Sequence, residues 1–166
     1  MPARDIPKIL WLVTSPVLII AAAGCANGDA LAARQAAVAE RGAQVMPFDL
    51  EATTHTFTKT DDGGIQIVAA DDPTDARQIE LIRQHLREER DNFARGDFDD
   101  PAAIHGHDMD GVAKLRQEHA DVTIDYLDRL DGAQLTYRTK QADLVEALHA
   151  WFDRQVMDHG SHAEAG

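Results

Sequence analysis

The sequence has a single cysteine, Cys25, among its 166 residues. One cysteine excludes an intramolecular disulfide and a cysteine-rich zinc site. Basic side chains are also scarce, because 16 lysines and arginines stand against 29 aspartates and glutamates, for a net charge of −13. A protein that binds nucleic acid needs clustered lysines and arginines to neutralise phosphates, so we exclude nucleic acid as a partner. The excess of carboxylates instead predicts a solvated surface that attracts cations.

The signatures of common catalytic sites are absent as well. The sequence has no GxSxG elbow, no Walker loop, no GxGxxG turn and no HExxH zinc motif. A metal-assisted hydrolase would need an open coordination position and a nearby general base, and the sequence indicates neither. We therefore expect a binding protein rather than an enzyme, with the hydrolase as the least favoured alternative.

The N-terminus has the pattern of an export signal. Arg4 and Lys8 precede an apolar run over residues 9–23, and small residues lead to Cys25. The stretch Ala22-Ala23-Gly24-Cys25 resembles the lipobox of bacterial lipoproteins, whose usual form is Leu-Ala-Gly-Cys. The resemblance implies cleavage before Cys25 and attachment of a diacylglyceryl group to its sulfur. The mature domain would then be extracytoplasmic and held at the membrane by lipid.

Two other interpretations of this segment stay open. An uncleaved membrane anchor fits poorly, because the apolar run is shorter than the roughly 20 residues of a span and Pro16 interrupts it. A plain secretory signal, cut elsewhere and with Cys25 incidental, is the nearer alternative. All three interpretations place the domain outside the cytoplasm.

The remaining chain divides into three parts. Residues 25–45 hold the lipidated cysteine and an alanine-rich spacer, whose small side chains can form only a marginal helix. Residues 46–160 form a single domain with enough chain for one hydrophobic core. Residues 161–166 are expected to be a flexible tail.

Local patterns predict two hairpins, each followed by a helix. Threonines alternate with other residues over 53–60, an Asp-Asp-Gly-Gly turn follows, and residues 65–69 return as a second strand. Residues 122–127 and 133–139 repeat the arrangement around Asp131-Gly132. Apolar residues at helical spacing predict helices over 74–95 and 141–159, while 97–110 is predicted as a polar loop and 111–120 as a short helix.

Hairpin-plus-helix therefore occurs twice, which suggests an internal duplication. An isolated hairpin cannot bury its apolar face, so the two units should pack together. We predict an α+β fold in which two hairpin-plus-helix units form a four-stranded antiparallel sheet with the helices on one face.

Histidine is the most informative residue type, with eight in the chain, all beyond residue 50. Neutral imidazole is the commonest metal-binding side chain, and imidazoles with carboxylates suit copper or zinc. The candidate ligands are His55, His85, His105, His149 and His159, with His107 and Met109 as alternates. They predict a tethered metal-binding protein acting as a scavenger, chaperone or sensor, provided that these side chains meet in the fold.

Each histidine also has a simpler explanation. A single histidine on a core-facing strand is more often a buried, hydrogen-bonded residue than a ligand, and a histidine pair on a loop is more often solvated. The threonine-rich face of residues 53–60 also leaves open a non-enzymatic module that docks a protein or small ligand on an uncovered sheet face.

Several stretches carry a family resemblance across residues 46–162. They are Met46-Pro47-Phe48-Asp49-Leu50, Thr53-Thr54-His55, Gly96-Asp97-Phe98, Asp100-Pro101-Ala102-Ala103-Ile104-His105-Gly106 and Ala147-Leu148-His149-Ala150-Trp151-Phe152-Asp153. The chain resembles a family of small exported bacterial proteins that are sometimes labelled aspartate carbamoyltransferase and have no established activity. The residues do not support that label, because carbamoyltransferases use a Ser-x-Arg-Thr phosphate-binding turn and this chain has none.

Overall fold

The computed structural model describes the backbone of residues 23–166 and the side chains from residue 28 onward. The predicted signal segment, residues 1–24, falls almost wholly outside this range, and so does the side chain of Cys25, so cleavage and lipidation stay predictions. Across residues 23–166, the structure contains no helix with the length and apolar character that a membrane crossing requires.

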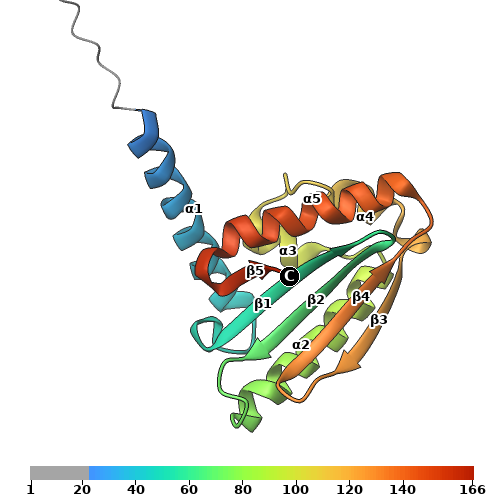
Figure 1. Cartoon of the computed structure of the whole chain (residues 1–166), viewed down its shortest axis with the longest axis horizontal. Helices are drawn as coiled ribbons and strands as arrows, with labels where there is room; N and C mark the ends of the chain where they lie inside the picture. The colour runs from blue at the N-terminus through green and yellow to red at the C-terminus, as the bar shows by residue number, and fades with distance from the viewer. Residues whose placement is uncertain (1–22) are drawn as a thin grey trace, which may run out of the picture.

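A five-stranded mixed sheet in the order β3-β4-β2-β1-β5 forms the centre of the α+β fold (Figure 1). The antiparallel strands are β1 (Thr53–Thr60), β2 (Gly63–Ala70), β3 (Thr123–Asp128) and β4 (Gly132–Arg138). Both predicted hairpins are confirmed. The prediction of a purely antiparallel, four-stranded sheet is wrong at one edge, where β5 (Ala163–Ala165) pairs in parallel with β1.

Two long helices lie against the sheet. Helix α2 (Ala76–Ala94) begins after Asp75, whose carboxylate accepts hydrogen bonds from the N–H groups of Arg77 and Gln78 and so caps the first turn. Helix α5 (Ala142–His159) ends at Gly160, which has a φ of 57°. The helix α4 (Val112–Gln117) and the 3₁₀ turns η1 (Leu50–Ala52), η2 (His119–Asp121) and η3 (Gly160–His162) complete the connections.

The segment predicted as a loop over 97–110 contains a further helix, α3 (Asp99–His105). Two aspartates in its first turn interact favourably with the positive end of the helix dipole. Pro101 also fits in the first turn, because backbone N–H groups there have no partner within the helix. The polar composition that suggested a loop therefore reflects a short helix with an acidic start.

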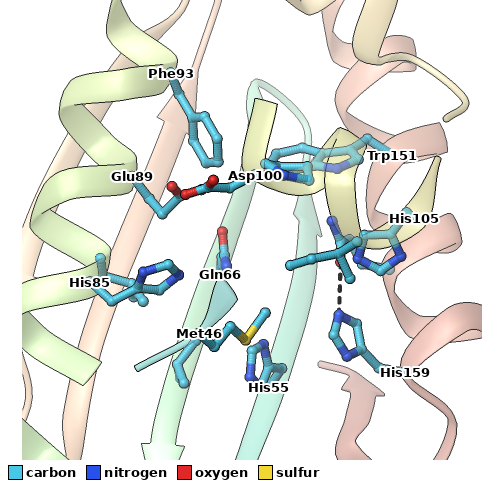
Figure 2. Close-up of a pocket in the computed structure, with 15 residues that line it drawn as sticks. Met46, His55, Gln66, His85, Glu89, Phe93, Asp100, His105, Trp151 and His159 are labelled. Carbon is cyan, nitrogen blue, oxygen red and sulfur yellow. Dashed lines mark hydrogen bonds between the residues drawn. The ribbon is translucent and has the colours of Figure 1, made fainter. Parts of the chain in front are cut away.

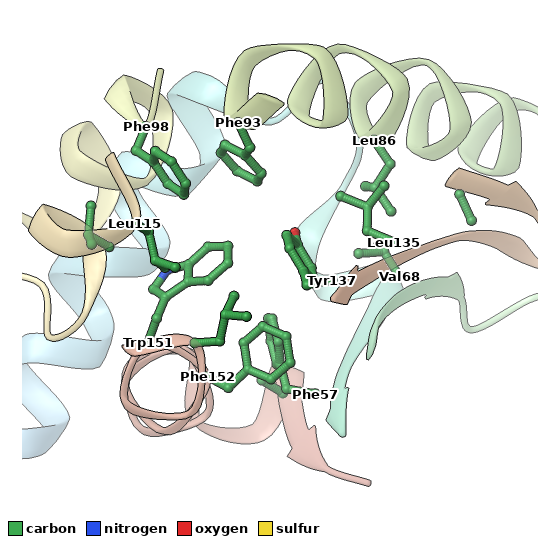
Figure 3. Packing of buried hydrophobic residues seen from close by; sticks show 14 of the residues in the cluster. Phe57, Val68, Leu86, Phe93, Phe98, Leu115, Leu135, Tyr137, Trp151 and Phe152 are labelled. Carbon is green, nitrogen blue, oxygen red and sulfur yellow. The ribbon is translucent and has the colours of Figure 1, made fainter. Parts of the chain in front are cut away.

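The two hairpin-plus-helix units are interlocked. Helix α2 follows the first hairpin but packs mainly over β3 and β4, whereas α5 follows the second hairpin and packs over β1, β2 and β5. Aromatic rings fill the space between the helices and the sheet (Figure 3). Phe93 stacks on Phe98 with ring centres 4.6 Å apart, and the Trp151 ring stands edge-on to both and to Tyr137. Each half thus supplies the cover that the other half's hairpin needs.

The opposite face of the sheet is not covered by the described residues. Along β1 the side chains of Thr53, His55 and Phe57 are buried, while the intervening threonines are only partly buried. Because successive side chains in a strand point to opposite faces, this alternation separates a core face from a threonine-rich solvent face.

The spacer and the tail both differ from expectation. In α1 (Ala23–Val45), residues 28–33 are exposed, but Val38 is 1% exposed. On either side of Val38, Arg34 binds His105 of α3 and Asp158 of α5, and Arg41 binds Ile104 of α3. Only the first turns of this helix extend away from the body (Figure 1). The residues predicted as a flexible tail form η3 and β5, because β1 offers them an open edge with free backbone groups.

Candidate metal centre

A cavity of about 40 Å³ lies between α2 and α5, with β1 and β2 as its floor and α3 as its cover (Figure 2). Its polar lining comes from five elements and from the end of the α1 connection: Met46, His55, Gln66, His85, Glu89, Asp100, His105, Gln155 and His159. No lysine or arginine is among the lining residues. A cavity with imidazoles, carboxylates and no cationic side chain is suited to a positively charged ligand.

Three imidazoles form one wall of the cavity. The ring centre of His159 lies 5.1 Å from that of His55 and 5.0 Å from that of His105. The rings of His55 and His159 are stacked at 22°, while those of His105 and His159 meet edge to face. The three come from β1, α3 and α5, so only the tertiary fold brings them together.

Hydrogen bonds set the orientation of two of these rings. His105 Nδ1 lies 3.0 Å from Asp158 Oδ2, and His159 Nε2 lies 3.1 Å from Gln155 Oε1. Both partners are acceptors, so the neutral rings donate at those nitrogens and keep a lone pair on the other one. The His55 side chain is 3% exposed, and its Nε2 has no hydrogen-bond partner among the described residues.

Asp158 holds this wall in place through hydrogen bonds on the side away from the cavity. Its side chain is fully buried and accepts hydrogen bonds from Arg34 of α1, from His105, and from Arg154 of its own helix. Burial opposes ionisation of Asp158, but these three partners outweigh it and lower its pKa to about 2. Arg34 also donates to the backbone carbonyl of His105. The aspartate therefore holds His105 as a carboxylate commonly holds a metal-ligating histidine.

All four cavity histidines are neutral at pH 7. Burial lowers the pKa of His55 to about 3, with further lowering by His85, His162 and His105, and it lowers the pKa of His159 to about 2 with help from His55 and His105. Burial also lowers the pKa values of His85 and His105. Metal binding requires the neutral form of imidazole, so these rings do not have to lose a proton first.

Two carboxyl groups form the opposite wall. His85 and Glu89 lie one turn apart on α2, and the carboxyl groups of Glu89 and Asp100 point toward one another (Figure 2). Glu89 is 7% exposed, and burial together with Asp100 raises its pKa to about 8. The one hydrogen bond donated to it comes from Asn92 at 3.4 Å.

Four of the five principal candidates therefore line one cavity. His149 does not, because it faces the first hairpin, where its Nε2 donates to the carbonyl oxygens of Thr60 and Gly63 at 3.0 and 2.9 Å. The alternates do not line it either: His107 is exposed, and Met109 is buried in the hydrophobic core. Each of these three has a structural reason for its position that does not involve a ligand.

Sequence reasoning missed Met46, Glu89, Asp100 and Asp158. The spacing of His85 and Glu89 was a usable signal, since residues four apart share a helix face. The position of Asp158 was hidden, because nothing local shows that it faces Arg34, 124 residues away. In the described part of the chain, no group of three or more His, Cys, Asp or Glu side chains is arranged to hold a metal ion.

The three imidazole rings have the separation that a shared metal ion requires, but not the orientation. Two imidazoles that share one ion at about 2 Å per bond place their ring centres roughly 5 Å apart, as these do. The ring planes are the obstacle, because the stacked rings of His55 and His159 direct their lone pairs past one another. Rotation of the side chains about χ2 is the movement that coordination would require.

No protein family, curated protein or solved structure matches this chain, so its resemblance to the small exported bacterial proteins stays a prediction.

Proposed function

We propose that this domain binds a transition-metal ion, copper or zinc, through His55, His105 and His159. The observation that carries the proposal is the meeting of these three neutral imidazoles in one small cavity, with ring centres 5.0 and 5.1 Å apart. They come from three elements that are distant in the sequence. Burying several polar rings together is costly unless they gain partners, and a shared ion would supply them.

Two further features support a metal ligand rather than a purely structural cluster. Asp158 orients His105 and leaves its Nε2 free, which is the arrangement of a carboxylate behind a metal-bound histidine. The buried Nε2 of His55 lacks a hydrogen-bond partner among the described residues, and coordination would satisfy it. Met46 also lines the cavity, and a thioether favours copper in its reduced form.

The proposed location is outside the cytoplasm, on the periplasmic side of a membrane or at the cell surface, with a lipid on Cys25 as the anchor. Helix α1 (Ala23–Val45) includes the backbone of Cys25 and reaches α3 and α5. A protein held there would act on metal outside the cytoplasm as a scavenger, chaperone or sensor. Labelling with palmitate should mark the wild-type chain and not Cys25→Ser, and an exported Cys25→Ser chain cleaved as before would contradict the lipid anchor.

Metal titration tests the binding proposal. The full chain, in the Cys25→Ser background and in mild detergent, should bind Cu(I), Cu(II) or Zn(II) with a Kd below about 1 μM. Replacing His105 and His159 together by glutamine should weaken binding at least a hundredfold. The matched controls are His149→Gln and His107→Gln, which should bind as the parent does. Binding that is weaker than micromolar, or that survives the double change, would reject the site.

A further inference from the structure

The cover of the cavity depends on α1 for its position. Helix α3 lines the cavity with Asp100, Pro101, Ile104 and His105. With only seven residues, this helix is too short to be stable by itself. Among the described helices and strands, it packs mainly against α1. Whatever holds α1 in place therefore also keeps the cavity covered.

Two arginines of α1 hold the C-terminal end of α3. Arg41 Nε donates to the carbonyl oxygen of Ile104 at 2.6 Å, and Arg34 Nη2 donates to that of His105 at 3.1 Å. The last carbonyl groups of a helix have no partner within it, and cations there interact favourably with the helix dipole. Arg34 and Arg41 are two helical turns apart and therefore lie on one face of α1, with the buried Val38 between them. The two arginines thus join α3 to this face of α1.

Helix α1 is also bonded to the C-terminal end of α5. Arg34 donates to both carboxylate oxygens of Asp158, at 2.5 and 2.7 Å, and Gln35 donates to the carbonyl oxygen of Met157 at 2.8 Å. Asp158 in turn lies 3.0 Å from the ring nitrogen of His105. Helix α1 therefore bridges α3 and α5, which both supply walls of the cavity.

Polar contacts hold α1 in place, whereas the hydrophobic core does not include it. The core cluster around the sheet contains no residue of α1 from position 28 onward. The Arg34 side chain is 32% exposed, so water competes for its hydrogen bonds. A segment with few buried apolar contacts and solvent-accessible hydrogen bonds opens at a lower free energy than the core. Helix α1 can therefore leave its position while the sheet and the two long helices stay folded.

We propose that α1 is a strap that controls access to the cavity. When α1 moves away from α3 and α5, α3 loses its support and the imidazoles of His105 and His159 become accessible to solutes. Met46 follows the last residue of α1 and lines the cavity, so the same movement takes one more side chain out of the lining. The inference goes beyond the proposed metal binding and does not depend on it, because any ligand of the cavity would pass the same cover. Helix α1 includes the backbone of Cys25, so the proposed lipid anchor would be connected directly to the strap.

Chemical modification of the histidines tests the strap. Diethyl pyrocarbonate reacts with neutral imidazoles that solvent can reach, and mass spectrometry locates the modified residues. The full chain in the Cys25→Ser background is treated at neutral pH, in mild detergent and with a chelator present. In this parent, the exposed His107 should react quickly, whereas His105 and His159, which are 5% and 8% exposed, should react slowly.

Arg34→Gln with Arg41→Gln should raise the reaction rates of the two cavity histidines about tenfold or more, because α3 then lacks its two charged donors from α1. His149 bonds to the carbonyl groups of the first hairpin, so it should react at the parent's rate. Arg77→Gln with Arg95→Gln is the matched control. It removes the same charge from exposed positions near the two ends of α2, and it should react as the parent does.

Hydrogen exchange separates local opening from global unfolding. In the double variant, exchange should become faster at the amides of Ala102 and Gly106, which bond within α3 and to the residue before it, and should stay slow in β2 and β4. Unchanged histidine reactivity would overturn the strap. Equal acceleration in α3 and in the central strands would also overturn it, because α1 would then unfold only together with the whole domain.

Arg41→Gln alone is a milder change, which keeps the bonds of Arg34 to Asp158. If the double variant does not fold, this single variant decides the question: faster modification of His105 supports the strap, and the parent's rate overturns it. All rates are measured in chelator, so they do not depend on whether the cavity binds metal. A failed metal titration therefore leaves the strap standing, and a failed strap leaves the metal site to its own test.

Discussion

Asp158 shows how much one residue contributes to the candidate site. Asp158→Asn keeps the shape of the side chain but removes the charge that Arg34 and Arg154 share. Hydrogen bonds to charged groups are worth about 1.5–3 kcal/mol each, and both arginines are partly solvated, so we expect a loss of about 2–3 kcal/mol in the free energy of unfolding. Urea denaturation at neutral pH measures this loss.

Asp153→Asn is the matched control for that change. Asp153 lies on the same helix and forms an ion pair with Lys59, but its side chain is 69% exposed. Exposed pairs contribute little, so its removal should change stability by less than about 0.5 kcal/mol. Equal effects of the two substitutions would show that the buried network around Asp158 is not important for stability.

The raised pKa of Glu89 leads to a prediction about the stability of the protein at alkaline pH. Its pKa is raised from 4.5 to about 8 in the folded state, so the folded protein keeps a proton that the unfolded chain has lost. The resulting stabilisation is complete below about pH 4.5 and disappears as the pH rises through about 8. Because one pKa unit corresponds to about 1.4 kcal/mol, the folded protein should lose up to about 3 kcal/mol between about pH 6 and 9.

Glu89→Gln should abolish this alkaline loss. The variant has no proton to release, so its unfolding free energy should stay flatter over the same pH range and exceed that of the parent at about pH 9. The neighbouring Glu88 is exposed, and Glu88→Gln should leave the parent's pH dependence intact. Parallel curves for the parent and Glu89→Gln, measured by urea denaturation, would contradict the raised pKa.

The histidines in the sequence indicated the location of the site only approximately. His55 and Phe57 lie two positions apart in a strand and therefore share a face, and both are buried. His85 and His149 lie on the two long helices, α2 and α5, yet His85 enters the cavity and His149 binds the hairpin turn. The sequence gives an angle around a helix axis, whereas the choice between cavity and turn depends on which strand lies opposite.

At the scale of elements, β5 is the feature with the clearest consequence. Its three residues pair with β1, Ala163 is 8% exposed, and the Gly166 N–H donates to the Phe57 carbonyl at 3.1 Å. Removing residues 163–166 should lower the free energy of unfolding by about 1–2 kcal/mol through lost hydrogen bonds and burial. It should also expose the edge of β1, so we expect concentration-dependent association in sedimentation experiments.

Glu164→Gln separates the backbone contribution of β5 from that of its side chains. Glu164 is exposed and accepts a hydrogen bond from the Thr56 hydroxyl, and glutamine preserves the strand pairing. This variant should stay monomeric and within about 0.5 kcal/mol of the parent. A shortened chain as stable and monomeric as Glu164→Gln would mean that β5 does not protect the edge.

Elements with strong local patterns could be predicted, and elements defined by their partners could not. Alternating residues over 53–60 fixed β1, and the stripe through Ile79, Ile82 and Leu86 fixed α2. The strand β5 has no such pattern, since its pairing depends on the free edge of β1. The side chains of residues 34–45 are mostly small, so the sequence predicted little burial there. In the structure, Arg41 and Arg34 of this segment bind the carbonyl groups of Ile104 and His105.

At the scale of the whole molecule, the interlocked halves create the cavity. Helix α2 brings His85 and Glu89 over the sheet from one half, and α5 brings Gln155 and His159 from the other. The predicted association of the two units is thus also what makes a candidate site possible. The way in which each helix covers the opposite hairpin was not predictable, because periodicity identifies an apolar face but not the surface that it meets.

This cavity should also set the pH of maximum stability. The unfolded chain binds protons at its histidines as the pH falls below 6.5, whereas His55 and His159 in the folded protein stay neutral down to about 3 and about 2. His85 and His105 shift in the same direction. Stability contributed by these groups is therefore complete above about 6.5 and decreases as the pH falls toward their folded pKa values.

The acid and alkaline effects oppose one another, and their balance can be measured. Each proton by which the folded and unfolded chains differ changes the unfolding free energy by about 1.4 kcal/mol per pH unit. Up to four histidines act below pH 6.5, and the single Glu89 acts in the opposite direction between about pH 4.5 and 8. Unfolding free energies measured in chelator should therefore peak at roughly pH 6.5–7 and fall more steeply on the acid side. His55→Gln with His159→Gln should make the acid side shallower, whereas Glu89→Gln should flatten the alkaline side and make the acid side steeper. A parent curve without a maximum between about pH 5 and 8 would show that these rings and this carboxyl are not buried together as described.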